Sequence, residues 1–246
     1  KYCLHRLRTA AQNRDFVRKH PGFALPPAHL AFDAYNHADW HAYHDSGRLH
    51  ASVFARIIKE NIGESRLHIL EWGCGPGRLI RQLPGLFDDR EVEISGTDYN
   101  PDTIRWCKEH LPGIDFQNND LMPPLPFEDD SFNAAYNFSV FTHLGEETQH
   151  AWAKELRRVL KPGGVLICTT HGENYRYLLA TKEDQETFDA GKIVIQGKYR
   201  EGKKWYFAIH PAAYVKNELL RDFKNVRRHQ VSEADNLLQD VWIGEK

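Results

Sequence analysis

The chain of 246 residues has a mass of 28.5 kDa and 41% apolar residues, which suits one large α/β domain or two small ones and excludes a largely disordered chain. Lys and Arg (32) nearly balance Asp and Glu (34), and the net charge of −2 disfavours a nucleic-acid-binding protein, which normally carries a clear positive excess. No apolar run approaches the roughly 18 residues of a membrane helix and the first residues show no signal-peptide core, so we expect a cytoplasmic protein.

Residues 1–62 are rich in histidine, arginine and aromatic side chains, and we expect helices joined by loops there. Pro26 and Pro27 divide this segment into two parts. In the later part, apolar residues recur at helical spacing, at Val53, Phe54, Ile57 and Ile58. This spacing predicts an amphipathic helix that ends near residues 61–63.

From residue 67 onward, short apolar runs alternate with helical stretches. The predicted strands cover residues 67–72, 92–97, 114–117, 132–138 and 165–169. The predicted helices between them cover residues 78–83, 101–110 and 146–160. Alternation at this pace indicates βαβ units with parallel strands and right-handed crossovers. The chain is therefore predicted to form an α/β fold with a Rossmann-like sheet.

Residues 172–210 interrupt this alternation. We expect a helix at 182–189, then a β-hairpin whose strands cover 193–199 and 204–209. A segment of about 39 residues buries too little apolar surface to fold alone, so it is predicted to be an insertion over the sheet. A helix at 211–222 and strands at 226–231 and 238–244 are expected to complete the domain.

A glycine-rich turn follows the first predicted strand. Gly73, Gly75 and Gly77 allow unusual backbone angles and the close approach of a ligand. A dinucleotide fingerprint, GxGxxG, would need glycine at position 78, where Arg78 stands. The acidic Glu71 would repel a pyrophosphate but suits a ligand that bears an ammonium and a sulfonium. The alternative is a tight turn that binds nothing.

Two further carboxylates follow the next two predicted strands. Asp98 ends the second strand, where an acidic group in a nucleotide-binding sheet accepts hydrogen bonds from ribose hydroxyls. Asp120 follows the third strand and is placed to accept from an adenine amine. Each residue alone would more often be a turn or cap residue. Three acidic residues at successive strand ends beside a glycine turn favour a nucleoside ligand.

Together, these residues resemble a class I S-adenosylmethionine-dependent methyltransferase. The similarity covers about 67–171 and includes Leu125-Pro126-Phe127, Ser131-Phe132 and the run from Glu155 to Gly164. It implies a mostly parallel seven-stranded sheet, in the order 3-2-1-4-5-7-6, with helices on both faces and an antiparallel last strand. The sequence departs at Asn133, where relatives usually have Asp.

The resemblance also implies how S-adenosyl-L-methionine is bound. Glu71 and the loop Gly73–Gly77 would hold the methionine part, Asp98 the ribose hydroxyls, and Asp120 with the Leu121 amide the adenine. The complete set of residues assigned to the cofactor is Glu71, Gly73, Cys74, Gly75, Gly77, Asp98, Tyr99, Asp120, Leu121 and Asn137.

Residues for the methyl acceptor are expected after the fourth and fifth strands, because ligands bind at the carboxyl ends of such strands. His143 and His171 stand there as candidate general bases, and His210 is a weaker candidate whose alternative role is a cap before Pro211. Many relatives use an N-terminal helix as a lid, so residues 1–62 are expected to form a lid over the domain at 63–246. Within it, Tyr43 and His44 either close over the donor or simply pack at the surface.

The insertion at 172–210 is expected to shape the acceptor pocket, with a hairpin that is aromatic at residues 205–207. The absence of Asn-Pro-Pro-Tyr and Pro-Cys motifs argues against methylation of nucleic-acid bases. Residues 169–171 lack clustered Mg²⁺ ligands, and the four cysteines fit no CxxC metal site, so no metal is expected. Basic clusters are expected to be solvated surface rather than an RNA track; they comprise Lys198, Arg200, Lys203 and Lys204, and Arg227 with Arg228.

The favoured function is therefore methylation of a small molecule, with a hydroxyl group of a sugar, glycan precursor or secondary metabolite as the acceptor. Two alternatives stay open at this point. The chain could bind the donor as a regulatory protein without turnover, or it could be a nicotinamide-dependent oxidoreductase on a similar sheet. Glu71 and Arg78 oppose the second alternative.

Overall fold

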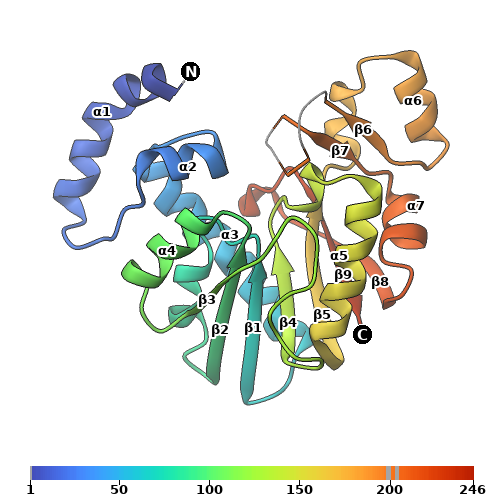
Figure 1. Ribbon diagram of the computed structural model, residues 1–246, viewed down its shortest axis with the longest axis horizontal. Coiled ribbons are helices and arrows are strands. Elements are labelled where there is room, and N and C mark those ends of the chain that lie inside the picture. The colour runs from blue at the N-terminus through green and yellow to red at the C-terminus, as the bar shows by residue number, and fades with distance from the viewer. Residues whose placement is uncertain (1, 198–200, 203–204) are drawn as a thin grey trace.

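A seven-stranded sheet forms the centre of the computed structural model, which describes residues 2–197, 201–202 and 205–246 (Figure 1). The strands are β1 (Arg66–Trp72), β2 (Glu91–Asp98), β3 (Asp115–Asn118), β4 (Phe132–Asn137), β5 (Leu160–Thr170), β8 (Lys224–His229) and β9 (Asp240–Glu245). Their spatial order is β3-β2-β1-β4-β5-β9-β8; β9 pairs antiparallel with both β5 and β8, and the other pairs are parallel. This confirms the expected order 3-2-1-4-5-7-6, because the β6–β7 hairpin precedes the last two strands in the chain.

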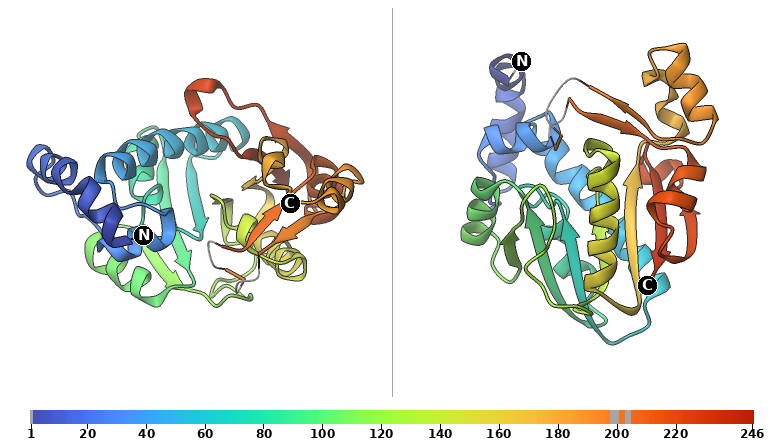
Figure 2. Two further views of the ribbon diagram at one scale, coloured as in Figure 1. Left: turned by 90° about the horizontal axis from the view of Figure 1, so that it is seen from above. Right: turned by 45° about the vertical axis from the view of Figure 1, so that its right-hand side comes forward.

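Helices cover both faces of the sheet (Figure 2). One face carries α3 (Trp40–Asn61), η1 (Ile80–Leu86) and α4 (Pro101–His110), and the other carries α5 (Glu146–Val159), α7 (Ala212–Tyr214) and η4 (Val215–Leu219). Side chains of β1 alternate between the two cores, since Leu67 and Ile69 belong to the first and Leu70 and Trp72 to the second. Both faces are thus buried, as is usual for parallel sheets.

The N-terminal segment forms α1 (Tyr2–Lys19), α2 (Ala28–Tyr35) and α3. The apolar side chains whose spacing predicted an amphipathic helix lie on α3 and are all buried in the core; they are Val53, Phe54, Ile57 and Ile58. Phe16 of α1 packs with Trp40 and Tyr43 of α3 in a separate small cluster, which attaches the first helix to the domain. Although α3 has 22 residues, neither it nor any other described helix is apolar enough to cross a membrane.

Three predicted segments form a different kind of structure from the one expected, and the last two strands are displaced by one or two residues from the predicted 226–231 and 238–244. The helix expected at 78–83 is a run of turns followed by the 3₁₀ helix η1, because Pro84 has no N–H to donate and clashes with a regular α-helical turn. The helix expected at 211–222 divides into α7 and the π-helical turn η4. Residues 161–164, between the helix expected at 146–160 and the strand expected at 165–169, belong to β5, which begins at Leu160 and accommodates them through a register shift against β4.

The insertion contains η3 (Glu173–Leu178), the expected helix as α6 (Lys182–Asp189), and the hairpin of β6 (Val194–Gln196) and β7 (Phe207–Ile209). Both strands are shorter than expected. The basic cluster of Lys198, Arg200, Lys203 and Lys204, and the predicted strand ends near it, lie outside the described residues. The hairpin lies beyond the carboxyl end of β5, where the N–H of His210 donates to the carbonyl of His171 (2.7 Å; Figure 1).

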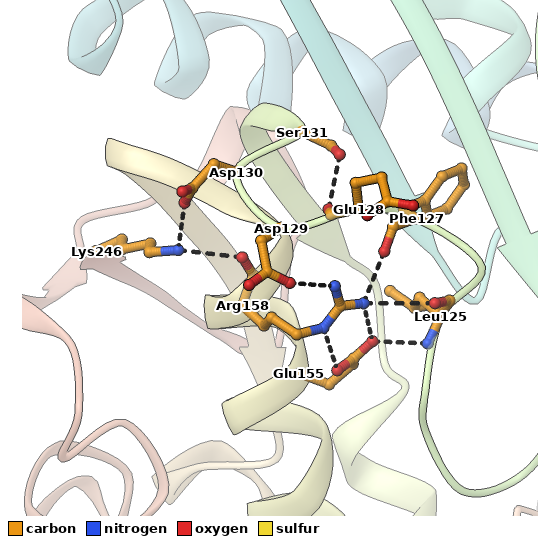
Figure 3. Close-up of polar contacts among 9 residues, drawn as sticks. All are labelled: Leu125, Phe127, Glu128, Asp129, Asp130, Ser131, Glu155, Arg158 and Lys246. Carbon is orange, nitrogen blue, oxygen red and sulfur yellow. Dashed lines mark hydrogen bonds and ion pairs between the residues drawn. The ribbon is translucent and has the colours of Figure 1, made fainter.

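An ion-pair cluster at the opposite end of the sheet holds the loop before β4 against α5 (Figure 3). The Glu155 carboxylate accepts hydrogen bonds from the N–H of Leu125 (2.7 Å) and from Arg158 (2.7 Å). Arg158 also donates to the carbonyl of Phe127 (2.8 Å) and pairs with Asp129 (2.6 Å). Most of these residues belong to the motifs behind the family resemblance, so that part of the pattern stabilises the fold at the end of the sheet opposite the hairpin.

Candidate functional site

A cavity of about 470 Å³ opens at the carboxyl ends of the parallel strands. Its wall comes from the turn after β1, the end of β2, the loops after β3 and β4, helix α2, and the hairpin of the insertion. In Figure 2, α2 and the hairpin approach this end of the sheet from opposite sides. Open α/β sheets bind their ligands at this position, so the cavity is the candidate site.

The turn after β1 brings bare backbone into the cavity. Gly73, Gly75 and Gly77 have φ values of 76°, 52° and 73°, which are left-handed conformations that glycine adopts readily. A Cβ atom at Gly75 would lie 2.8 Å from the hydroxyl oxygen of Tyr35. The N–H of Gly75 donates to Oδ2 of Asp98 (2.9 Å), which ties the turn to the end of β2. The turn therefore holds a shape that leaves room only for glycine.

Glu71 is a buried acid at the end of β1, with 2% of its surface exposed. Its Oε2 accepts a hydrogen bond from the hydroxyl of Tyr136 (2.7 Å). Burial raises the pKa of Glu71 to about 8, although the bond from Tyr136 and the positive charge of Arg78 act in the opposite direction. The carboxyl group is thus largely protonated at neutral pH and would ionise readily beside a cation.

The ends of β2 and β3 supply the polar groups farther along the cavity. Asp98 is nearly buried, and its Oδ1 accepts from the N–H of Asn100 (2.9 Å). Asn119 is also buried, and its Oδ1 has no hydrogen-bond partner. Asp120 and Leu121 line the cavity as exposed residues. This region can therefore accept hydrogen bonds from a polar ligand through several oxygens.

Glu201 and Gly202 of the insertion contact residues that follow two different strands of the sheet. The Tyr99 hydroxyl donates to the carbonyl of Gly202 (3.2 Å), and the N–H of Gly202 donates to the carbonyl of His143 (2.8 Å). The Glu201 carboxylate accepts from the N–H of Gly145. Residues that follow β2 and β4 are thus joined through the insertion, which bridges one side of the cavity.

His143 and His171, the two candidate bases, both line the cavity, and their ring centroids lie 6.4 Å apart. Nδ1 of His143 is 2.9 Å from the carbonyl oxygen of Tyr206. A carbonyl only accepts, so Nδ1 carries the proton and Nε2 keeps its lone pair. Burial lowers the pKa of His143, and it lowers that of His171, which stacks on Tyr175 (4.0 Å), to about 3. Both rings are neutral imidazoles at neutral pH.

Some predicted residues do not line the cavity. His210 is fully buried, and its Nε2 lies 3.1 Å from Oε1 of Gln149, so it is a core residue rather than a base or a surface cap. Gly77 and Asn137 are absent from the cavity wall, and neither polar atom of the Asn137 side chain has a partner. The remaining predicted cofactor residues all line the wall. In the part of the chain that the structure describes, no three His, Cys, Asp or Glu side chains gather as metal ligands.

The N-terminal wall differs from the one expected. Tyr43 is buried, and its hydroxyl donates to the carbonyl of Pro76 (2.6 Å), so it supports the glycine turn from the side away from the cavity. His44 lies outside the cavity, beside Asp45. The lining residues come from α2 and the turn after it and are Leu30, Asp33, Ala34, Tyr35, Asn36 and His37. Sequence reasoning missed them because a helix of eight residues has too few turns to show which side faces a ligand.

The loop after β4 adds two further residues that the sequence did not single out. Phe138 and Ser139 line the cavity, and Ser139 has a left-handed φ of 63°. The Ser139 hydroxyl lies 2.9 Å from Oγ1 of Thr142 and accepts from Nε2 of Gln239 (2.7 Å). The feature that marks Ser139 is its positive φ, which is uncommon for a residue other than glycine. A backbone angle of this kind cannot be read from the sequence.

Comparisons with known proteins agree with this geometry. Residues 69–164 match the family model described as a methyltransferase domain. A probable S-adenosylmethionine-dependent methyltransferase from Mycolicibacterium smegmatis is 32% identical over 123 residues, which are 50% of this chain and 44% of the relative. A ubiquinone biosynthesis O-methyltransferase from Cereibacter sphaeroides is 29% identical over 50% of this chain and 49% of its own length.

Among solved structures, an S-adenosylmethionine-dependent methyltransferase from Methanosarcina mazei superposes with a TM-score of 0.56 at 21% identity. The match covers 77% of this chain and 96% of that one, and it supports the fold. The chain spans about half the length of the curated relatives that it matches.

Proposed function

We propose that this chain, which carries a class I S-adenosylmethionine-dependent methyltransferase domain, methylates a hydroxyl group of a small molecule. The observation that carries the proposal is the cavity itself, where a glycine turn, a buried acid and a neutral imidazole face one space. The name of the Cereibacter relative, an O-methyltransferase, supports an oxygen acceptor.

The residues around the glycine turn fit S-adenosyl-L-methionine. Gly73 and Gly75 present backbone without side chains, and Glu71 offers a buried carboxyl group to an ammonium. Asp98 and the unpartnered Oδ1 of Asn119 provide acceptors for ribose hydroxyls and an adenine amine. When bound, the donor supplies an electrophilic methyl group on a sulfonium.

His143 is the favoured general base. Its tautomer is set by the carbonyl of Tyr206, which leaves Nε2 able to accept the proton of a hydroxyl. The lowered pKa keeps the ring unprotonated at neutral pH, so it can act without first losing a proton. His171 stands 6.4 Å away across the same wall and is the second candidate. Holding acceptor and donor in line lowers the barrier further, because the reaction becomes effectively unimolecular.

The acceptor would lie between α2 and the insertion. His37 and Tyr35 line one side of the cavity, and Phe207 of β7 lines the other. This mixture of aromatic faces and imidazoles suits a small hydroxylated molecule such as a sugar, a glycan precursor or a secondary metabolite. In this proposal, residues 1–62 form a lid through α2. Residues 172–210 shape the side of the cavity that binds the acceptor.

The test is a methyl-transfer assay with donor labelled on the methyl group and pooled hydroxylated small molecules as acceptors. We expect label in an acceptor, and loss of most of that signal in His143→Gln. The matched control is His29→Gln, because His29 is exposed and lies outside the cavity. Tight donor binding with no transfer to any pool would favour the regulatory alternative. Absence of donor binding by the folded chain would refute the proposal.

A further inference from the structure

The loop after β4 carries His143 and begins with an unusual backbone conformation. It starts at Phe138 and Ser139 and continues as the 3₁₀ helix η2 (Phe141–His143). Ser139 has a left-handed φ of 63°, an angle that is unfavourable for a residue other than glycine. Such a conformation persists only where the surrounding contacts fix it. The contacts around Ser139 therefore decide where this loop and His143 at its end lie.

Gln239, which directly precedes β9, closes a chain of hydrogen bonds around Ser139. The N–H of Ser139 donates to Oγ1 of Thr169 (2.8 Å), and the Thr169 hydroxyl donates to Oε1 of Gln239 (2.5 Å). Nε2 of Gln239 then donates to the hydroxyl of Ser139 (2.7 Å). The oxygens of Ser139 and Thr142 lie 2.9 Å apart, and the Thr142 hydroxyl donates to the carbonyl of Ser139 (2.7 Å).

The direction of each bond in this chain follows from the groups that form it. A carbonyl only accepts, so the Thr142 hydroxyl gives its proton to Ser139, and the Ser139 hydroxyl donates to Thr142 in return. The Ser139 oxygen then accepts from the amide of Gln239. A side-chain amide accepts at one atom and donates at the other, as this position requires. Only 8% of Gln239 is exposed, so water competes little for these bonds.

The position of His143 depends on the same loop. Its N–H donates to the carbonyl of Val140 (3.0 Å), so the imidazole follows the backbone that Ser139 begins. Nδ1 of His143 must reach the carbonyl of Tyr206 (2.9 Å) for Nε2 to stay free as a proton acceptor. A displacement of about 1 Å in a group that takes part in a reaction can lower its rate about a hundredfold.

We propose that Gln239 is a positioning residue for methyl transfer, which holds Ser139 and through it the loop that carries His143. The inference rests on the proposed function, in which His143 is the general base. Gln239 and Thr169 stand outside the cavity wall, whereas Ser139 and His143 line it. Gln239 therefore acts on the reaction through the loop and touches neither the donor nor the acceptor.

The first experiment observes His143 by nitrogen-15 NMR of the imidazole rings, with its resonance assigned by its loss in His143→Gln. The original chain should show a neutral ring at pH 7 with the proton on Nδ1. Gln239→Met keeps the size of the side chain but removes its hydrogen bonds. We expect this variant to lose the fixed tautomer and the pKa of His143 to rise toward its ordinary value of 6.5.

Two further variants serve as controls for this measurement. Gln239→Glu still accepts from Thr169 and can also accept from the Ser139 hydroxyl, so it should keep most of the original pattern. Arg158→Met removes hydrogen bonds at the opposite end of the sheet. It tests whether lower stability alone alters the ring, and it should leave the His143 resonance unchanged.

The second experiment measures transfer to whichever acceptor takes up label in the assay above. We expect Gln239→Met to lower kcat about ten- to a hundredfold, because the base is misplaced. The KM for the acceptor and the affinity for S-adenosylhomocysteine in calorimetry should stay unchanged. If circular dichroism shows that Gln239→Met is unfolded, Thr142→Val takes its place in both experiments. It is isosteric, removes two bonds of Ser139 and should change kcat and the His143 resonance in the same direction.

An unchanged His143 resonance in the folded variant overturns the inference, whatever the rate of transfer. An altered resonance with kcat at its original value overturns it as well, and also excludes His143 as the base. If the original chain transfers no methyl group, the proposed function fails, whereas the NMR comparison still decides whether Gln239 holds the ring of His143 in place.

Discussion

The protonation of Glu71 provides a quantitative test of whether this residue binds the ammonium of the donor. Its pKa of about 8 means that roughly nine in ten free molecules carry the proton at pH 7. An ammonium placed beside a carboxylate lowers its pKa by about 1–3 units, here to between about 5 and 7. Binding of S-adenosylhomocysteine should therefore release between about 0.4 and 0.9 of a proton at pH 7.

The released proton is measurable by calorimetry at pH 7 in phosphate and in Tris, whose heats of ionisation differ. The slope of the binding enthalpy against the heat of ionisation gives the number of protons. Because the complex holds fewer protons than the free chain, affinity should rise with pH between about 6 and 8. Glu71→Gln should abolish both effects, while the exposed Glu109→Gln should retain them. A slope of zero in the unmodified chain would refute the assignment of the ammonium to Glu71.

The same pKa predicts how the unliganded chain responds to pH. The folded pKa lies above the ordinary value of 4.5, so the folded state holds the proton more tightly, and stability falls as pH rises from about 4.5 to 8. At 1.36 kcal/mol per unit, the loss from this group is at most about 5 kcal/mol. Urea unfolding across this range should show the decline, and Glu71→Gln should flatten it. An equal decline in the variant would show that other groups cause it.

Three further changes test other parts of the molecule. His143→Gln should lower the rate of methyl transfer by about a hundredfold or more while donor affinity stays unchanged, and transfer at the original rate would exclude it as the base. Asp98→Asn should weaken S-adenosylhomocysteine binding by about 1–3 kcal/mol in calorimetry, and an unchanged affinity would contradict a ribose contact. Arg158→Met should lower the free energy of urea unfolding by about 1–3 kcal/mol, more than Arg157→Met, without changing donor binding.

The family pattern in the sequence has two physically distinct halves. The turn after β1 and the acids after β2 and β3 line the cavity. The other half, around Phe127 and Glu155 to Arg158, forms the ion-pair cluster at the opposite end of the sheet (Figure 3). Burial raises the pKa of Glu155, but the hydrogen bonds from Arg158 and from the N–H of Leu125, together with the charge of Arg158, outweigh it and hold the pKa below its ordinary value. Both halves contribute to the family resemblance, although only the first lines the cavity.

The parallel pairing of the first five strands and the residues of the proposed donor side could be predicted from the sequence, whereas the order of the strands followed only from the family resemblance. Strands followed by helices in regular alternation force parallel pairing, and parallel strands bring their carboxyl ends together. Local rules are therefore enough to place Glu71, Asp98 and Asp120 at one edge of the sheet. The tight turn at Gly73 and Gly75 could be predicted equally well, because the conformational freedom of glycine is a property of the residue itself.

The side of the cavity proposed to bind the acceptor was decided by tertiary structure. α2 forms its wall instead of Tyr43 and His44, because the packing of Phe16 against Trp40 and Tyr43 turns Tyr43 inward. His210 and His143 are the same residue type in different surroundings: His210 is buried against Gln149, whereas His143 lines the cavity. Sequence spacing determines which residues share a strand end or a helix face. Which of them becomes buried, loses its charge or meets a ligand depends on contacts between segments far apart in the chain.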